Sequence, residues 1–404
     1  MTTETIGDTR RLQDTRLPWA GLLALFFAGF LSIINETTPA GLLPEIAATL
    51  HVTEAVAGQT VTVYALATAV SAVPLSIALR RWGRRTLLVT ALAAFVVSNL
   101  AIAVTDDFAV ILVARFVAGV GAGLVWTNLA AAAARLVSER HQGRAMSIAN
   151  AGTPVALSLG LPLGTLLGNT TGWHFTFAAT GIAGAATIVW VLIALPALPA
   201  VVVPRQPRGE RPRSRFLRGA PGVLTILAVM SGFFLAHNVL YTYIAALVDT
   251  AGIASQVEWV LLSFGVAAFV SILVTGLWID RHHRHLTVGG LLLLAAAFLL
   301  LGFVTVSPVL VYVAAVLWGL GFGGGATWFL TAGFRAAGSD SIAAVMVTLV
   351  NAMIGAGALV GGALIGAFGT GSLSWVAFAV MVPSAIAAIV ARRHAFPPTG
   401  GRGA

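Results

Sequence analysis

Two formal charges stand inside long apolar stretches of this chain, Glu36 in the first stretch and Arg115 in the fourth. A charged side chain inside a bilayer is costly, so each of these residues needs a partner or water, and such residues tend to be functional. Burial disfavours a charged carboxylate, whereas a nearby guanidinium favours it. A carboxyl group under both influences could take up and release a proton. We therefore expect Glu36 to carry a proton and Arg115 to tune it, with a static ion pair or a hydrated Glu36 as the alternative.

Other polar residues are sparse in the apolar stretches, and several accompany aromatic side chains. A pocket of aromatic side chains with a few hydrogen-bonding groups suits a small amphipathic molecule. A lone histidine in such a stretch is more often a packing residue than a proton relay, which is the alternative for His237. The candidate pocket residues are Thr38, Tyr64, Trp126, Asn128, His237, Asn238, Tyr241, Tyr243, Thr327 and Trp328.

The apolar stretches themselves define the class of protein. The chain has 404 residues, of which 58% are hydrophobic and only 9% are charged. A membrane-spanning helix needs roughly 20 apolar residues, and twelve stretches reach about that length. These observations predict an all-α integral membrane protein with twelve transmembrane helices in two six-helix bundles. The expected spans are 18–42, 56–79, 86–104, 108–134, 145–168, 175–198, 221–247, 259–279, 286–306, 309–333, 341–367 and 375–391.

Arginine marks one side of the predicted membrane. All 23 basic residues are arginine, and apart from Arg115 they fall before the first stretch and after every second one. This positive-inside bias predicts that both termini are cytoplasmic. Orientation and the anionic inner leaflet account for the net charge of +9, so we expect the lipid bilayer, and no nucleic acid, as a partner. The absence of cysteine excludes disulfides and thiolate metal sites, and we expect no metal and no cofactor.

The same topology places the two charges at one depth. Glu36 lies about six residues before the expected end of its span, and Arg115 lies seven residues after the start of its own at Phe108. At 1.5 Å per residue, both are expected roughly 10 Å below the outer surface.

A Pro- and Arg-rich segment divides the chain in the middle. We expect a cytoplasmic tail at 1–17, a first bundle at 18–198, a cytoplasmic linker at 199–220, a second bundle at 221–391 and a cytoplasmic tail at 392–404. At an offset near 202, Gly119 and Trp126 in the fourth stretch match Gly321 and Trp328 in the tenth. Unless this match arises by chance, it indicates a parallel repeat, the layout of one class of transporter.

Two loops carry a partly matched motif. The loop after the second stretch keeps Gly83, Arg84 and Arg85, and the loop after the eighth keeps Gly276, Asp280, Arg281 and Arg284. Together they resemble the G-x-L-x-D-R-x-G-R-R signature of the major facilitator superfamily. In that family the loop latches neighbouring helices in the outward-open state. Arg80 stands where the family has the acidic residue, which puts the first latch in doubt.

Further segments are similar to the bacterial sugar-efflux and drug:proton antiporter branch, including Asn35–Ala47 and Gly160–Thr165. Arg115 matches the arginine of the R-x-x-x-G-x-G-x-G motif of proton antiporters. The fifth stretch resembles the family's glycine-proline motif, and its glycines recur at helical spacing, which permits close approach of another helix. The proline at Pro162 also permits bending. The glycines are Gly152, Gly160, Gly164 and Gly168.

The resemblance implies a major facilitator fold in which the first and fourth spans line a central cavity, so that Glu36 and Arg115 could meet. It implies a proton-coupled efflux antiporter for small organic molecules such as drugs, sugars or related metabolites, working by alternating access. An uptake symporter or a uniporter of the same fold is the alternative. An integral-membrane enzyme is a further alternative, although neither H-E-x-x-H nor G-x-S-x-G occurs. Arginine-rich composition without lysine favours a bacterial cytoplasmic (inner) membrane, and we expect a monomer to function.

Overall fold

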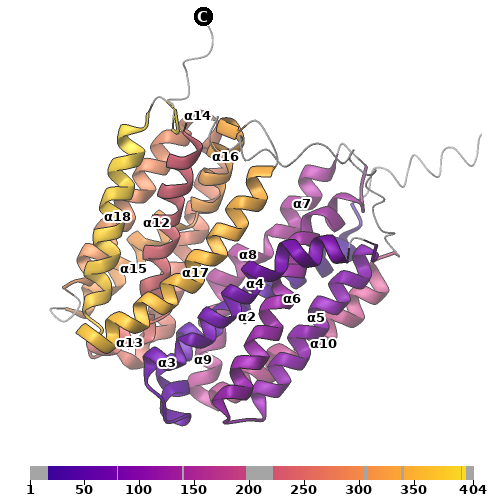
Figure 1. The fold of residues 1–404 in the computed structure, drawn as a ribbon, viewed down its shortest axis with the longest axis horizontal. Helices are drawn as coiled ribbons and strands as arrows, with labels where there is room; N and C mark the ends of the chain where they lie inside the picture. Colours follow the sequence, from indigo (N-terminus) through magenta and orange to yellow (C-terminus); the bar gives the residue numbers. More distant parts are fainter. Residues whose placement is uncertain are drawn as a thin grey trace, which may run out of the picture.

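The computed structural model describes residues 17–79, 81–138, 141–196, 222–303, 307–337, 341–392 and 394–396. Every regular element within these ranges is helical. Two groups of helices are evident in Figure 1, the first bundle (α2 to α10) and the second bundle (α12 to α18). The predicted linker at 199–220 lies outside the described residues, as do 1–16 of the N-terminal tail and 393 and 397–404 of the C-terminal tail.

The helix bounds follow the predicted stretches closely. The first bundle contains α2 (Trp19–Thr49), α3 (Glu54–Ala57), α4 (Gln59–Ala78), α5 (Arg84–Ala103), α6 (Phe108–Ala134), α7 (Gln142–Asn150), α8 (Gly152–Val155), a π-helix (Ala156–Gly160), α9 (Leu161–Thr171) and α10 (Trp173–Ala194). The second contains α12 (Val223–Tyr241), α13 (Ile244–Thr250), a 3-10 helix (Ala254–Gln256), α14 (Val257–Leu301), α15 (Pro308–Phe322), α16 (Gly325–Ala337), α17 (Ser341–Phe368) and α18 (Ser372–Val390). Among the described residues, 11 helical segments are long and apolar enough to cross a membrane, which confirms an all-α membrane fold.

The fifth predicted stretch is absent from those 11 because it is not one continuous helix. Its helical segments are α7, α8, the π-helix and α9. The proline at 154 has no backbone N–H to donate, so the regular hydrogen-bond ladder cannot pass through it. A π-helix, Ala156–Gly160, follows it, and such π-bulges are a common cause of bends in helices. The fifth span therefore lies where the sequence predicts it, but it is divided into short helical segments.

One boundary differs from the prediction, and another predicted break falls inside a single helix label. The first span continues to Thr49 rather than ending near Leu42, although Pro39 and Pro44 lie inside the helix. The predicted break at 280–285 coincides with a kink, because α14 leaves the helical conformation at His282 and forms two separate membrane-crossing segments, Ala254–Ile279 and Arg281–Leu301. Proline-containing membrane helices persist where neighbouring helices and hydroxyl side chains satisfy the backbone.

The bundles touch each other toward one end. We call the end where α2 begins and α18 finishes the terminal end, and the end with α3, α9 and α13 the opposite end. In Figure 1 the ribbons of the bundles meet near the opposite end and separate between α7 and α16. The Thr62 hydroxyl donates to the Gly355 carbonyl over 3.3 Å, and the Ser158 hydroxyl donates to the Gly265 carbonyl over 2.8 Å.

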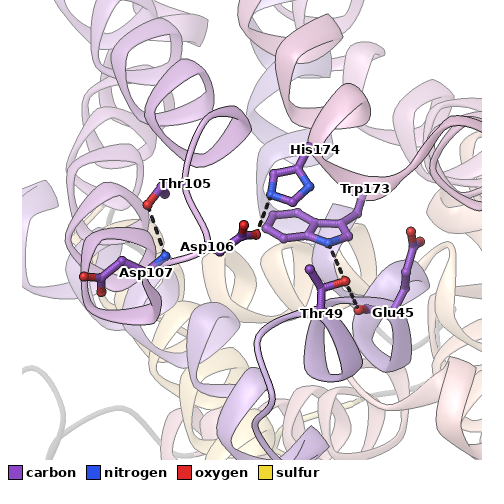
Figure 2. Close-up of polar contacts among 7 residues, drawn as sticks. All are labelled: Glu45, Thr49, Thr105, Asp106, Asp107, Trp173 and His174. Atoms are coloured by element: carbon purple, nitrogen blue, oxygen red, sulfur yellow. Dashed lines mark hydrogen bonds and ion pairs between the residues drawn. The ribbon is translucent and has the colours of Figure 1, made fainter.

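The opposite end of the first bundle is fastened by the group of residues in Figure 2. The Trp173 indole donates to the Thr49 hydroxyl over 3.2 Å, and that hydroxyl donates to the Glu45 carbonyl over 2.9 Å. The His174 ring lies 3.1 Å from the Asp106 carboxylate. These contacts connect the end of α2, the α5–α6 connection and the start of α10, so they hold this rim together.

Candidate functional site

Arg115 is the centre of the candidate site. It lies on α6 and is 1% exposed. Its Nε donates to the Thr60 carbonyl over 3.0 Å, and its two terminal nitrogens donate to the carbonyls of Asn35 and, over 3.4 Å, of Glu36. The guanidinium carbon lies 4.4 Å from the centroid of the Tyr64 ring, a cation–π distance. Backbone carbonyls on two other helices therefore hold a fixed positive charge inside the first bundle.

Close packing of α4 against α6 allows this reach. A Cβ at Gly119, one turn after Arg115, would lie 2.3 Å from the Tyr64 carbonyl oxygen. The Thr68 hydroxyl lies within hydrogen-bonding distance of both the Tyr64 carbonyl, at 3.0 Å, and the Gly119 carbonyl, at 2.9 Å. The Tyr64 hydroxyl donates to the Ser32 carbonyl on α2 over 3.0 Å. Helices α2, α4 and α6 are thus tied together around the guanidinium group.

Glu36 lies next to this cation but does not pair with it through its side chain. Arg115 contacts its backbone oxygen, and among the described residues no cationic nitrogen lies within 4.0 Å of its carboxylate. Its side chain is partly exposed, whereas those of Asn35 and Thr37 are buried. The carboxylate lies within electrostatic range of Tyr64 on α4 and of Tyr241 on α12, so residues of both bundles surround it. The sequence predicted Glu36 and Arg115 at the same depth in the membrane. In the structure they are adjacent, and Arg115 contacts the backbone carbonyl of Glu36 rather than its carboxylate.

Two asparagines, Asn35 and Asn99, extend the site beyond the residues predicted for it from the sequence. The Asn99 amide donates to the Asn35 side-chain oxygen over 2.6 Å and to the Phe95 carbonyl over 2.7 Å. Both asparagines are 1% exposed. In the sequence, each of them is visible as an amide side chain inside an apolar stretch, the first stretch for Asn35 and the third for Asn99. This bond connects α5 to the turn of α2 whose carbonyls receive Arg115.

His237 on α12 belongs to an aromatic cluster in the second bundle. The Trp318 indole, which can only donate, donates to His237 Nδ1 over 2.9 Å. The ring stacks on Phe322, with 3.7 Å between centroids, and on Tyr241, at 4.8 Å. His237 therefore accepts at Nδ1 as a neutral imidazole in this arrangement. The Tyr241 hydroxyl is buried, and among the described residues it has no hydrogen-bond partner.

Several other pocket candidates lie away from Glu36 or are engaged in packing. The Tyr243 hydroxyl donates to the Ala358 carbonyl over 2.7 Å near the opposite end. The Trp328 indole donates to the Thr275 hydroxyl over 2.9 Å within the second bundle. The Thr38 hydroxyl and the Asn238 amide each donate to a backbone carbonyl one turn earlier in their own helices. The last two candidates are Trp126, which packs against the core of the first bundle, and Thr327, which is exposed.

The arginines of the two motif loops bind helix ends near the terminal end. Gly83 precedes α5, and Arg84 donates to the Asn128 side chain. Arg85 donates to the Leu192 carbonyl over 2.5 Å. Asn128 thus contacts a motif arginine rather than Glu36.

The second motif segment holds the end of α18 and Phe396 in the same way. Arg284 donates to the carbonyls of Ala388, Ile389 and Phe396 over 3.3, 2.9 and 2.9 Å. Arg281 also has an interaction partner. A Cβ on Gly276 would meet nothing within 4 Å. Residue Arg80 and the side chain of Asp280 lie outside the described part of the chain.

The glycines of the broken fifth span face α2. A Cβ at Gly152 would lie 2.3 Å from the Phe26 carbonyl oxygen, and one at Gly160 or Gly168 would collide with Ile34 or Leu42. Gly164 makes no such approach, since its nearest atom lies at 3.8 Å. Pro162 lies in the first turn of α9 and is buried. This stripe therefore packs the broken span directly on the helix that carries Glu36.

Comparison with known proteins agrees with this architecture. The family model for the Major Facilitator Superfamily matches residues 25–347. A chloramphenicol efflux pump of Mycobacterium tuberculosis (strain CDC 1551 / Oshkosh) is 34% identical over 372 residues, covering 87% of this chain and 88% of the relative. A purine ribonucleoside efflux pump of Escherichia coli (strain K12) is 28% identical over 355 residues, covering 86% and 88%. The resemblance seen in the sequence is confirmed: the chain belongs to the major facilitator superfamily and is a multi-pass membrane transporter.

Proposed function

We propose that this transporter exports small organic molecules of the drug or nucleoside kind in exchange for protons. The names of its relatives, a chloramphenicol efflux pump and a purine ribonucleoside efflux pump, support the direction and the class of cargo. Their similarity extends over nearly the whole chain, so it includes both bundles. Cargo moves by alternating access as the bundles rock about a site between them.

The observation that carries this proposal is the unpaired carboxylate of Glu36 beside a fixed cation. Three backbone carbonyls hold the guanidinium of Arg115, so the cation stays in place whether or not Glu36 is charged. The carboxylate is partly exposed and lies within electrostatic range of tyrosines in both bundles, Tyr64 and Tyr241. A proton on Glu36 leaves the cation without a counter-charge, and release of the proton restores an acceptor for hydroxyl or amine groups of the cargo. Proton and cargo therefore compete for one group.

The positions of the contacts between bundles support an inward-facing conformation. Hydrogen bonds join the bundles through Thr62 and Ser158, and the ribbons separate toward the terminal end. The arginine distribution assigns the terminal end to the cytoplasm, in the cytoplasmic membrane of a bacterium. Glu36 would then be reached from the cytoplasm in this conformation, and one chain supplies every part of the site.

The test uses everted membrane vesicles energised to an acid interior, with chloramphenicol and a purine ribonucleoside as probes. Wild type and Glu36→Gln are compared at equal abundance in the membrane, with Asp249→Asn, an exposed residue near the end of α13, as the matched control. We expect a probe to dissipate the pH gradient through wild type and Asp249→Asn but not through Glu36→Gln. Equal dissipation through Glu36→Gln would show that the proton is carried elsewhere. Labelled probe that crosses without any change in the gradient would identify a uniporter.

A further inference from the structure

A groove lies on the outer surface of the second bundle, between α14 and α15. Its volume is about 710 Å³, within the range of roughly 300–1,000 Å³ typical of ligand sites. Its walls are almost wholly apolar, and Trp259, Val266, Val270 and Val316 are 40 to 56% exposed. Both helices belong to segments that can cross a membrane. The medium that contacts these exposed side chains is therefore lipid rather than water.

The groove has the length of one lipid leaflet. On α14 it extends from Trp259, near the opposite end, to Val270. Eleven residues at 1.5 Å each span about 17 Å. The hydrocarbon core of a bilayer is about 30 Å thick, so one leaflet supplies about 15 Å. An acyl chain that enters beside Trp259 would end near Val270 and Leu320, at the middle of the membrane.

The mouth of the groove is polar and acidic. The Tyr312 hydroxyl donates to the Gln256 side-chain oxygen over 2.8 Å, and the Glu258 carboxylate lies within electrostatic range of the same hydroxyl. Tyrosine and tryptophan at this level are typical of the membrane interface. The arginines on these two helices, Arg281 and Arg284, both lie on α14 beside its kink at His282, at the terminal end. A headgroup that carries an ammonium group therefore fits this mouth better than a purely anionic one.

We propose that this groove binds a phospholipid of the bilayer whose headgroup carries a primary ammonium group. One acyl chain occupies the channel between α14 and α15, packing on Val266 and Val316. The ammonium group donates to the Glu258 carboxylate, which has free acceptor positions besides its contact with Asn169 at 3.4 Å. Aromatic side chains of Trp259 and Tyr312 flank the glycerol region.

Native mass spectrometry of the purified full-length protein tests this proposal with three probes: phosphatidylethanolamine, phosphatidylcholine and phosphatidylglycerol. Val266→Trp fills the channel, and Glu258→Gln removes the charge at its mouth. Leu277→Trp is the matched control, because Leu277 is 79% exposed on the same helix outside the groove. We expect wild type and Leu277→Trp to retain phosphatidylethanolamine in preference to the other lipids. Retention should fall at least threefold in Val266→Trp, and the preference should disappear in Glu258→Gln.

Three results would overturn the proposal. One is undiminished retention of phosphatidylethanolamine by folded Val266→Trp. Another is equal retention of phosphatidylglycerol and phosphatidylethanolamine by wild type. The third is a dimer of wild type that Val266→Trp abolishes without changing lipid retention, since this would assign the groove to a second copy of the chain. If Val266→Trp does not fold, the comparison of wild type with Glu258→Gln decides, and an unchanged lipid preference in Glu258→Gln overturns the proposal.

Discussion

Tyr243 locks the bundles together at the opposite end, and Gly58 is the residue that makes room for it. A Cβ at Gly58 would lie 2.1 Å from the Tyr243 hydroxyl, and Cβ atoms at Gly361 and Gly362 would lie within 2.7 Å of the same side chain. The hydroxyl also donates to the Ala358 carbonyl. The ring thus fills a space between the α3–α4 junction of the first bundle and α17 of the second. We predict that Gly58→Ala opens this end.

The magnitude follows from the contacts. Gly58 has φ −60° and ψ −20°, which alanine adopts without strain, so the effect comes from space alone. Overpacking a tight site costs roughly 1–3 kcal/mol, and losing the hydroxyl bond costs roughly 0.5–1.5 kcal/mol. A total of about 2 kcal/mol favours conformations with this end open. Because each 1.4 kcal/mol is a factor of ten, the equilibrium shifts about 30-fold.

Double electron–electron resonance measures this shift as a change in the distance between two spin labels. The chain contains no cysteine, so Thr171→Cys in the first bundle and Phe368→Cys in the second place labels at exposed positions without further changes. We expect Gly58→Ala to move the population toward longer distances. Gly366→Ala is the matched control, because a Cβ there meets nothing within 4 Å. If folded Gly58→Ala and wild type have identical distance distributions, Tyr243 does not hold the two bundles together at this end.

Three further predictions concern the contacts that support the site and the bundle ends. Asn99→Leu removes the donor to Asn35 and should destabilise the protein by about 1 kcal/mol, the size of interhelical bonds in membranes, seen as a lower melting temperature; an unchanged one would contradict this. Arg284→Gln removes charged hydrogen bonds to carbonyls at the end of α18 and should speed hydrogen exchange of residues 388–396, with unchanged exchange as the contrary result. His174→Ala removes the contact between His174 and Asp106, whose side chains are 33% and 69% exposed. The free energy of unfolding should fall by less than about 1 kcal/mol, and the difference should vanish at high salt. A larger decrease that does not depend on salt would show that His174 acts through packing.

The length of the apolar stretches and the placement of arginine predicted the helices, because the thickness of the bilayer sets the length of a span and arginines favour its cytoplasmic side. The span at 108–134 agrees with α6 at both ends. Hydropathy located the fifth span, and its prolines indicated bending, but neither signal predicts the π-helix at Ala156–Gly160. The extension of α2 beyond Leu42 was missed for a related reason. Pro39 cannot donate to the Asn35 carbonyl, but Arg115 on α6 donates to that carbonyl instead and the helix continues.

The candidate site was only partly readable from the sequence. Glu36 and Arg115 were identified because a charge inside an apolar stretch is costly in a bilayer and tends to be functional. The partners of Arg115 are backbone carbonyls, and every residue has one, so residue types alone could not identify them. Asn99 was missed because its role depends on which helix α5 packs against. His237 carries a polar side chain, but the donor from Trp318 could be assigned only with the second bundle assembled.

Competition between proton and cargo at Glu36 is the central claim, and proton release on cargo binding measures it directly. Purified protein in weakly buffered solution with a pH indicator receives chloramphenicol or a purine ribonucleoside, while binding is followed separately with labelled probe. We predict that wild type and Asp249→Asn release protons as the probe binds, and that Glu36→Gln binds without releasing any. Proton release by Glu36→Gln equal to that of wild type would contradict the account.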